Sequence, residues 1–343
     1  MINKKNITIA LTTITVILAA LLVNHFYTKI YKSNVVKDGF VYIPSGSEFP
    51  DVKNLVHPFL KNTSAFNWVA KKKKYTNRIK AGKYELKDGM STNDLVNLLR
   101  SGNQTPVKIA FNNQDSFEKL AGRIAQQIEA DSLELLRVFN DERFIAEHKF
   151  NSATALSMYI PNSYEFYWNT NAQEFRSKML KEYHKFWNDS RLKKVKKLNL
   201  TPVEVSTIAS IVQKETAHVP ERKTVAGLYL NRYKNKWPLQ ADPTIIFAIK
   251  QQKGFDTEIK RVFLKDLEIN SAYNTYKNLG LPPGPIGMPD ISSIDAVLNP
   301  ANHDYYYMCA SVTDMGKHVF AKNLAQHNVN ARKYQNWVAK QGY

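Results

Sequence analysis

Glu215 is the acidic residue whose position in the sequence most favours catalysis. Thr201, Pro202 and Glu204 form a strong helix start, with an N-cap residue, a proline in the first position and an acid in the third. The predicted helix runs to Glu215, which follows Ile211 by four residues and therefore lies on the apolar face. Burial on that face would raise the pKa of the carboxyl group and suit it to donating a proton near neutral pH.

The same helix also admits a structural explanation for this glutamate. A Glu at a frayed helix end can be half solvated, or it can pair with a nearby cation, here Arg222. Structural ion pairs perturb pKa values as catalytic sites do. The helix alone therefore does not separate the two interpretations.

Three downstream segments carry side chains suited to lining a substrate groove. Two are proline-punctuated loops at residues 237–244 and 274–286, whose stiffness would fix a groove wall at low entropic cost. The third is a predicted strand on which His318 and Phe320 share one face. The candidate binding residues are Gln240, Asp242, Asn274, Tyr276 and His318. A satisfied buried polar group or a core aromatic is the competing interpretation for each, and we prefer it for Phe320.

Hydrophobic spacing predicts the elements that would position these residues. The expected elements are a helical stretch over 116–139 broken near Asp131, helices over 172–187, 201–215 and 225–234, strands over 305–310 and 317–321 joined by a turn at 313–316, and a last helix containing His327. Their order predicts a mixed α+β domain over residues 107–343.

The N-terminal residues predict a membrane anchor. Residues 7–23 carry no charge and approach the lower length limit for spanning a bilayer, with Lys4 and Lys5 before them and aromatic residues after. A cleaved signal peptide is one alternative, but residues 19–24 contain no small-x-small cleavage site. A buried core helix is another, which the terminal position and uniform apolarity disfavour. We expect a short tail over 1–6 and a transmembrane helix over 7–27, whose orientation the lysines on both sides leave undecided.

A small α+β module is expected over residues 38–105, after a short connector from Tyr27 to Lys37. The patterns predict a strand at 40–43, a helix at 52–60, a strand at 81–86 and a helix from Ser91 to Gly102, with Asp94 as the capping acid. This size and order resemble a LysM-like sugar-binding unit, although many small folds share them.

Composition restricts the classes of partner and cofactor. The 343 residues carry a net charge of +18, which favours polyanions such as nucleic acid, anionic lipid or an acidic wall polymer. No nucleic-acid motif surrounds the basic runs at 71–74 and 193–197, so we expect a solvated basic surface and no nucleic-acid partner. Cys309 is the single cysteine, which excludes an intrachain disulfide and a cysteine-based zinc site. The histidines lack metal-ligand spacing, so neither a metal nor a cofactor is expected.

A series of short motifs gives a more specific indication. They are IASIVQKET at 208–216, NR at 231–232, LQADPT at 239–244, NTY at 274–276, GLPPGPI at 280–286, GKHVF at 316–320 and HN at 327–328. In this order they closely resemble the YceG-like, or MltG, family of endolytic murein transglycosylases over most of residues 107–343. The anchor and the LysM-like unit also fall where that family has them.

The resemblance implies an activity and assigns residues to it. Glu215 falls at the family's catalytic glutamate, and Gln213 replaces a second Glu that many members have. Met315 stands where the family has a Gly before its Gly-His segment. Glu215 is then expected to protonate the glycosidic oxygen between N-acetylmuramic acid and N-acetylglucosamine. It would next remove the proton of the muramic acid C6 hydroxyl, which closes onto C1 as a 1,6-anhydro end.

Other functions and the cellular setting follow as expectations. A hydrolytic muramidase would need a second carboxylate, for which Asp242 is the candidate. A glycan-binding scaffold without activity is disfavoured by the apolar setting of Glu215. We expect a single-pass plasma-membrane lyase whose catalytic domain lies on the periplasmic or extracytoplasmic side and terminates nascent glycan strands. Peptidoglycan synthases are candidate partners.

Overall fold

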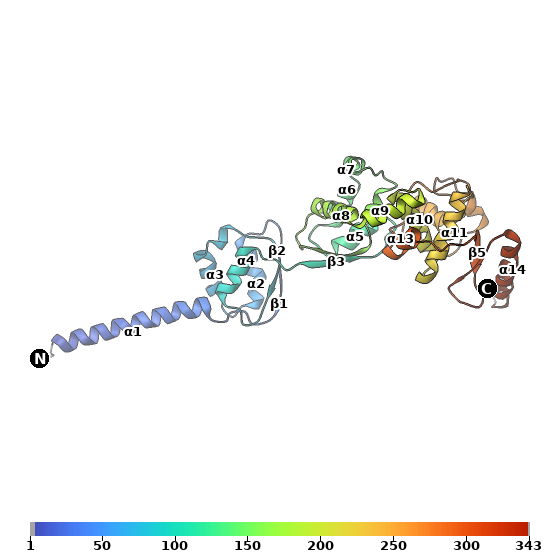
Figure 1. Cartoon of the computed structure of the whole chain (residues 1–343). Helices are drawn as coiled ribbons and strands as arrows, with labels where there is room; N and C mark the ends of the chain where they lie inside the picture. The colour runs from blue at the N-terminus through green and yellow to red at the C-terminus, as the bar shows by residue number, and fades with distance from the viewer. Residues whose placement is uncertain (1–3, 342–343) are drawn as a thin grey trace. The chain divides into compact units, whose positions relative to one another are not determined.

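The computed structural model describes residues 4–341 and has a mixed α+β architecture (Figure 1). The α+β class predicted from the sequence is therefore confirmed. The chain divides into two compact units. The first comprises Met1–Lys108, Gln127–Glu129 and Glu165–Thr170, and the second comprises Ile109–Gln126, Ala130–Tyr164 and Asn171–Tyr343.

One helix among residues 4–341 is long and apolar enough to cross a membrane. It is α1 (Lys4–Tyr31), with 28 residues, a mean hydropathy of 2.3 in its most apolar window and no burial of that window. The predicted connector from Tyr27 is wrong in its first residues, because the helix continues to Tyr31. No Gly or Pro interrupts the sequence there, so nothing ends the helix earlier.

The rest of the first unit is built on a two-stranded antiparallel sheet. Strand β1 (Gly39–Ile43) pairs with β2 (Gly82–Leu86) in a register from Gly39↔Leu86 to Ile43↔Gly82. Between the strands lie α2 (Phe49–Val56), the 3-10 turn η1 (His57–Phe59), α3 (Thr63–Lys72) and the 3-10 turn η2 (Tyr75–Asn77), and α4 (Thr92–Ser101) follows β2. One apolar core joins the sheet to these helices.

Local capping explains where the helices of this unit start. Ser91 caps α4 by accepting a hydrogen bond from the Asp94 N–H at 3.1 Å, and Gly102 ends it with φ +74°, as the sequence predicted. Helix α3 was not predicted, although Asn62 caps it by accepting from the Ala65 N–H at 2.9 Å. The helix predicted at 52–60 starts earlier, at Phe49, because a proline is tolerated in a first helical turn.

The remainder of the chain is mostly helical. Its first elements are β3 (Val107–Phe111), α5 (Phe117–Ala125), α6 (Ser132–Phe139), α7 (Glu142–Glu147), η3 (Ala155–Met158), β4 (Asn162–Phe166), α8 (Ala172–Phe186) and α9 (Asp189–Leu198). They are followed by α10 (Pro202–Glu215), η4 (Val219–Glu221), α11 (Arg222–Lys234), α12 (Asp242–Lys253), η5 (Leu264–Glu268), α13 (Ile291–Leu298), β5 (Tyr307–Ala310), β6 (His318–Ala321) and α14 (Leu324–Lys340). The break between α5 and α6 near Asp131 confirms the prediction.

Helix α10 is the central element of the second unit. Its first turn is a capping box, in which Thr201 accepts from the Glu204 N–H at 3.2 Å and Glu204 accepts from the Thr201 N–H at 2.7 Å. Its middle is buried on nearly all sides, and it packs against α9, α11, α12 and α13. Such a helix holds its last residue in a fixed position, because its neighbours leave it no room to move.

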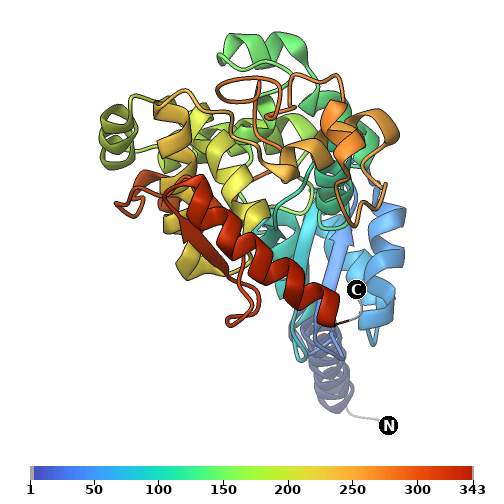
Figure 2. The same cartoon turned by 90° about the vertical axis from the view of Figure 1, so that its right-hand side faces the viewer.

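A short hairpin and the last helix complete this unit. Strands β5 and β6 pair antiparallel from Tyr307↔Ala321 to Ala310↔His318, close to the predicted ranges. Gly316 adopts φ +78° in the connecting turn, a conformation that glycine reaches without steric cost. Helix α14 packs along the hairpin (Figure 2).

Candidate active site

Helix α10 brings Glu215 to the edge of a cavity of about 230 Å³. The residues that precede it on the same face, Ile208 and Ile211, are buried, and Glu215 is half-buried. Lys214 points the other way, where its Nζ lies 2.7 Å from Asp115 Oδ1. The helix thus presents the glutamate on its inner face and the lysine on its outer face, as the spacing predicted.

The cavity gathers residues that are far apart in the sequence. It is lined by Glu215, Leu228, Tyr229, Arg232, Gln240, Asp242, Tyr276, Met308, Cys309, Ala310 and His318. All the site residues predicted from the sequence are present except Asn274. These side chains come from α10, α11, α12, the hairpin and two loops of a single unit.

Burial raises the pKa of Glu215 from its ordinary value of 4.5 to about 7. Three neighbours lower this pKa: the Tyr229 hydroxyl, which donates a hydrogen bond to Oε1 at 2.5 Å, the imidazole of His318 and the guanidinium of Arg232. The carboxylate of Asp242 raises it. Tyr229 occupies one carboxyl oxygen and leaves the other to carry the proton. The result is a carboxyl group that is both a usable acid and a usable base at neutral pH.

The ion pair considered as the structural explanation for Glu215 does not form. Arg222 instead places Nη1 2.7 Å from Asp290 Oδ2 and donates to the Ser292 hydroxyl at 2.5 Å. Gln213, the residue that departs from the family pattern, is also engaged, because its Oε1 accepts a hydrogen bond from the Asp290 N–H at 2.5 Å. These contacts hold the start of α13 against α10. Arg222 and Gln213 are therefore engaged elsewhere, and the Glu215 side chain lines the cavity.

Asp242 and Tyr276 form a hydrogen-bonded pair on the cavity wall. The Tyr276 hydroxyl donates to Asp242 Oδ1 at 2.5 Å, and burial raises the pKa of that hydroxyl, which keeps it protonated. The predicted loop at 237–244 is wrong at its end, because Asp242 is the first residue of α12 and Pro243 lies in the first turn. Gln240 precedes them with φ +48°, a strained backbone for a non-glycine residue, and such strain is typical of functional sites.

Asn274 lies beneath the cavity and does not line it. It is fully buried, and its amide nitrogen donates to the carbonyls of Leu267 and Ile269 at 2.8 and 2.9 Å. Its oxygen accepts from the Tyr276 N–H at 3.0 Å. Asn274 therefore positions the loop that carries Tyr276, while the adjacent Thr275 fixes Gln240 by accepting its N–H at 3.0 Å.

The proline-rich segment at 280–286 supports α10 from behind. The Ile286 N–H donates to the Ser210 hydroxyl at 3.0 Å. A Cβ on Gly284 would come within 2.0 Å of the Ala153 carbonyl oxygen, so only glycine fits there. The expectation that this segment forms a groove wall is not met at this cavity, since none of its residues lines it.

His318 reaches the cavity from β6 in a fixed orientation. Its Nδ1 lies 2.9 Å from Glu221 Oε2, and its backbone N–H donates to Glu221 Oε1 at 2.7 Å. Although burial alone would raise the pKa of Glu221, these hydrogen bonds hold it below its ordinary value. Phe320 stacks on Tyr305 with ring centroids 5.6 Å apart and does not line the cavity.

Three residues near Glu215 were not identified from the sequence: Tyr229, Glu221 as the partner of His318, and Arg232. The Arg232 guanidinium is buried and donates to the carbonyls of Tyr306 and Leu239 at 2.7 and 2.6 Å. The Asn-Arg motif at 231–232 included Arg232, but the sequence did not indicate what this residue does. Nothing in the spacing pointed to Tyr229, because its contact depends on how α11 packs on α10.

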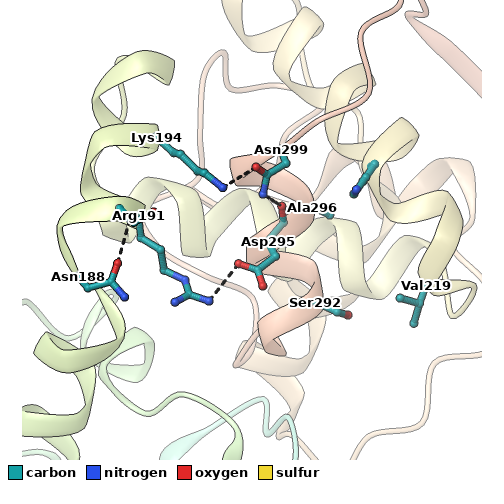
Figure 3. Close-up of a pocket in the computed structure, with 10 residues that line it drawn as sticks. Asn188, Arg191, Lys194, Val219, Ser292, Asp295, Ala296 and Asn299 are labelled. Atoms are coloured by element: carbon teal, nitrogen blue, oxygen red, sulfur yellow. Dashed lines mark hydrogen bonds and ion pairs between the residues drawn. The ribbon is translucent and has the colours of Figure 1, made fainter.

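A second, larger cavity of about 520 Å³ lies between α9, the start of α11 and α13 (Figure 3). Its carboxylate, Asp295, is paired with Arg191, with 3.2 Å between Oδ1 and Nη2. Lys194 Nζ lies 2.7 Å from the Asn299 side-chain oxygen. This cavity therefore contains cations and amides but no carboxyl group available for proton transfer. Of these two cavities, the smaller one contains the carboxyl group suited to proton transfer.

Comparison with known proteins gives a consistent result. The family model described as YceG-like family matches residues 41–333. A Bacillus subtilis (strain 168) protein named endolytic murein transglycosylase is 31% identical over 312 residues, covering 86% of this chain and 84% of that protein. A Streptococcus pneumoniae (strain D39) protein of the same name is 29% identical over 326 residues, covering 86% of this chain but 58% of that protein. A crystal structure of a yceG-like protein from Listeria monocytogenes superposes with a TM-score of 0.58 at 29% identity, covering 85% of this chain and 98% of that one.

Proposed function

Because the chain belongs to the YceG-like family, we propose that it is an endolytic murein transglycosylase, a lyase that cuts peptidoglycan glycan strands. The observation that carries the catalytic assignment is Glu215, a half-buried carboxyl group with a pKa of about 7 at the edge of a polar cavity. The activity rests on the relatives, and the assignment of residues rests on the geometry.

In the first step Glu215 acts as the acid. Its proton, on the oxygen that Tyr229 does not occupy, passes to the glycosidic oxygen between N-acetylmuramic acid and N-acetylglucosamine. The bond from the muramic acid C1 to that oxygen breaks, and the N-acetylglucosamine side leaves as an alcohol. Glu215 is left as a carboxylate that still accepts the Tyr229 hydrogen bond.

In the second step the same residue acts as the base. The Glu215 carboxylate takes the proton of the muramic acid C6 hydroxyl, whose oxygen bonds to C1 and forms the 1,6-anhydro ring. Atoms balance without water, and Glu215 returns to its protonated form. One carboxyl group therefore suffices, whereas a hydrolase usually needs two.

The other cavity residues bind and orient the sugars. Gln240, Asp242, Tyr276 and His318 present an amide, a carboxylate, a hydroxyl and an imidazole toward the cavity, which suits the acetamido and hydroxyl groups of the substrate. Asn274 contributes indirectly, by holding the Tyr276 loop.

A hydrolytic muramidase is the second candidate, because Asp242 shares the cavity with Glu215. The two reactions differ by one molecule of water in the product. Mass spectrometry of purified glycan treated with the protein separates them. Ends that are lighter by water support the transglycosylase, and reducing ends from the wild type would establish the muramidase.

We also propose that residues 38–105 form a LysM-like glycan-binding unit and that residues 107–343 form the catalytic domain. The strand–helix–helix–strand order from β1 to β2 and their antiparallel pairing support the first part. Residues 7–27 of α1 would anchor the protein in the plasma membrane as a single span, with the catalytic domain outside the cytoplasm where murein lies. Deleting the LysM-like unit should then reduce cutting of intact wall more than cutting of short glycan.

A further inference from the structure

The C-terminal end of α1 is part of the folded first unit. Ile30 packs against the core of the unit, and the Phe26 ring stacks on Trp68 of α3 with centroids 5.3 Å apart at 28°. Helix α1 also packs on α4. Helix α1 therefore continues without interruption from its apolar stretch into the packed part of the unit.

Helix geometry places α3 at a definite height relative to a bilayer. An α-helix rises about 1.5 Å per residue, so a hydrocarbon core about 30 Å thick takes up about 20 residues. Counted from Ile7, the first residue after the lysines at 4–5 and Asn6, that length ends near Phe26. With α1 spanning the membrane from Ile7, Trp68, which stacks on Phe26, would lie at the membrane interface, the level at which tryptophan is enriched.

Positive charge is concentrated around this tryptophan. Lys29 and Lys72 place Nζ 5.4 and 5.8 Å from the Trp68 ring centroid, and Lys71 is exposed beside them. The sequence contains no Asp or Glu in residues 1–37 or 52–84, so no carboxylate from these segments neutralises them. Lys73, by contrast, is bound to the side-chain oxygens of Asn93 and Asn97 and takes no part.

We propose that Trp68, Lys29, Lys71 and Lys72 form a binding surface for anionic phospholipid headgroups, which holds the first unit against the membrane. The indole would lie among the glycerol and carbonyl groups, and the ammonium groups would contact the phosphates. Each lysine near an anionic surface contributes about 1 kcal/mol, equivalent to about fivefold in lipid preference. The proposal rests on α1 spanning the membrane and is independent of the chemistry at Glu215.

The test uses the full chain in nanodiscs of phosphatidylcholine or of phosphatidylcholine with phosphatidylglycerol. Brominated lipid should quench the wild-type tryptophan fluorescence, and Trp68→Phe should remove most of that quenching. Competition between brominated phosphatidylcholine and unbrominated phosphatidylglycerol then gives the lipid preference at Trp68. We expect Lys71→Glu/Lys72→Glu to reduce that preference at least tenfold, whereas Lys196→Glu/Lys197→Glu, an equal charge change on exposed residues of α9, should leave it unchanged.

Two results would overturn the proposal. Quenching that persists in Trp68→Phe would place this residue away from the membrane. Loss of glycan cutting by Lys71→Glu/Lys72→Glu in detergent micelles, where no bilayer is present, would assign the lysines to the wall polymer. Loss of cutting with Glu215→Gln at an unchanged lipid preference would leave both proposals standing, since the two readouts are separate.

Discussion

Replacing Glu215 with Gln should abolish cutting and yet stabilise the protein at neutral and alkaline pH. Glutamine has nearly the same shape, and its side-chain oxygen still accepts the hydrogen bond from Tyr229. The variant lacks the proton to donate, so no anhydro ends should form. It also lacks a carboxyl group that is forced to ionise in a half-buried position.

The size of the effect follows from the pKa of Glu215. The pKa is 4.5 in the unfolded chain and about 7 in the folded one, so the folded state holds this proton more tightly. Below pH 4.5 both states are protonated, and the wild type has its full stability. Between pH 4.5 and 7 the unfolded state loses the proton first, and wild-type stability falls by about 1.4 kcal/mol per pH unit. Above pH 7 the accumulated loss reaches an upper bound of about 3 kcal/mol, which the glutamine variant avoids.

Thermal and denaturant unfolding of the two full-length proteins in the same detergent, from pH 4 to pH 9, measures this difference. The two free energies of unfolding should agree near pH 4 and separate progressively up to pH 8, with the variant more stable. Glu204→Gln is the matched control for removing a carboxylate from the same helix, because Glu204 lies in the first turn of α10 and does not line the cavity, so its replacement should leave cutting intact. A difference for Glu215→Gln that does not change with pH, or that has the opposite sign, would refute the assignment of Glu215 as an acid whose pKa is raised in the folded state.

Three further substitutions and one deletion test the rest of the site. Tyr229→Phe removes a hydrogen bond that lowers the pKa of Glu215. The alkaline limb of the pH–rate profile should therefore move up by about 1–2 pH units, and the maximal rate should fall. An alkaline limb that stays in place would contradict this role of Tyr229. Asp242→Asn should raise KM more than it lowers kcat, with anhydro ends still formed; an inactive variant would favour the muramidase. Asn274→Ala should destabilise the protein by about 1–3 kcal/mol in denaturant titrations, because it leaves two partly buried carbonyls without donors. Removing residues 38–105 should reduce release of product from intact wall more than from short glycan, and an equal loss on both would mean that the unit helps to build the active site.

Elements with local signals were predicted well from the sequence. The capping box at Thr201 predicted the start of α10, and the spacing of the apolar residues in this helix predicted that Glu215 lies on its inner face. Helix α12 was missed because Pro243 was interpreted as a loop residue, although a proline in the first turn is compatible with a helix. The helix at 291–298 was missed although Asp290 caps it by accepting from the Ser293 N–H at 2.7 Å.

Contacts between helices were beyond the reach of the sequence. The hydrogen bond from Tyr229 to Glu215 depends on the packing of α11 on α10, which no local pattern encodes. For Asn274 the sequence suggested a role that the structure does not show. Its position in a motif predicted substrate binding, but in the fold its side chain holds a loop in place. A buried amide and an exposed amide have the same sequence signature, and only the packing distinguishes them.

A single residue that acts first as an acid and then as a base needs a pKa close to the pH at which it works. Burial alone would drive the pKa of Glu215 higher and leave a poor base for the second step. Without burial, the Tyr229 hydroxyl and the His318 imidazole would lower the pKa of Glu215, and too small a fraction of the carboxyl group would be protonated for the first step. The pKa near 7 therefore results from opposing contributions. Glu221 maintains the lowering contribution of His318, because it holds the imidazole in place. In the proposed mechanism both steps depend on this balance and neither Tyr229 nor Glu221 transfers the proton, so changes at these two residues should alter the pH dependence of cutting.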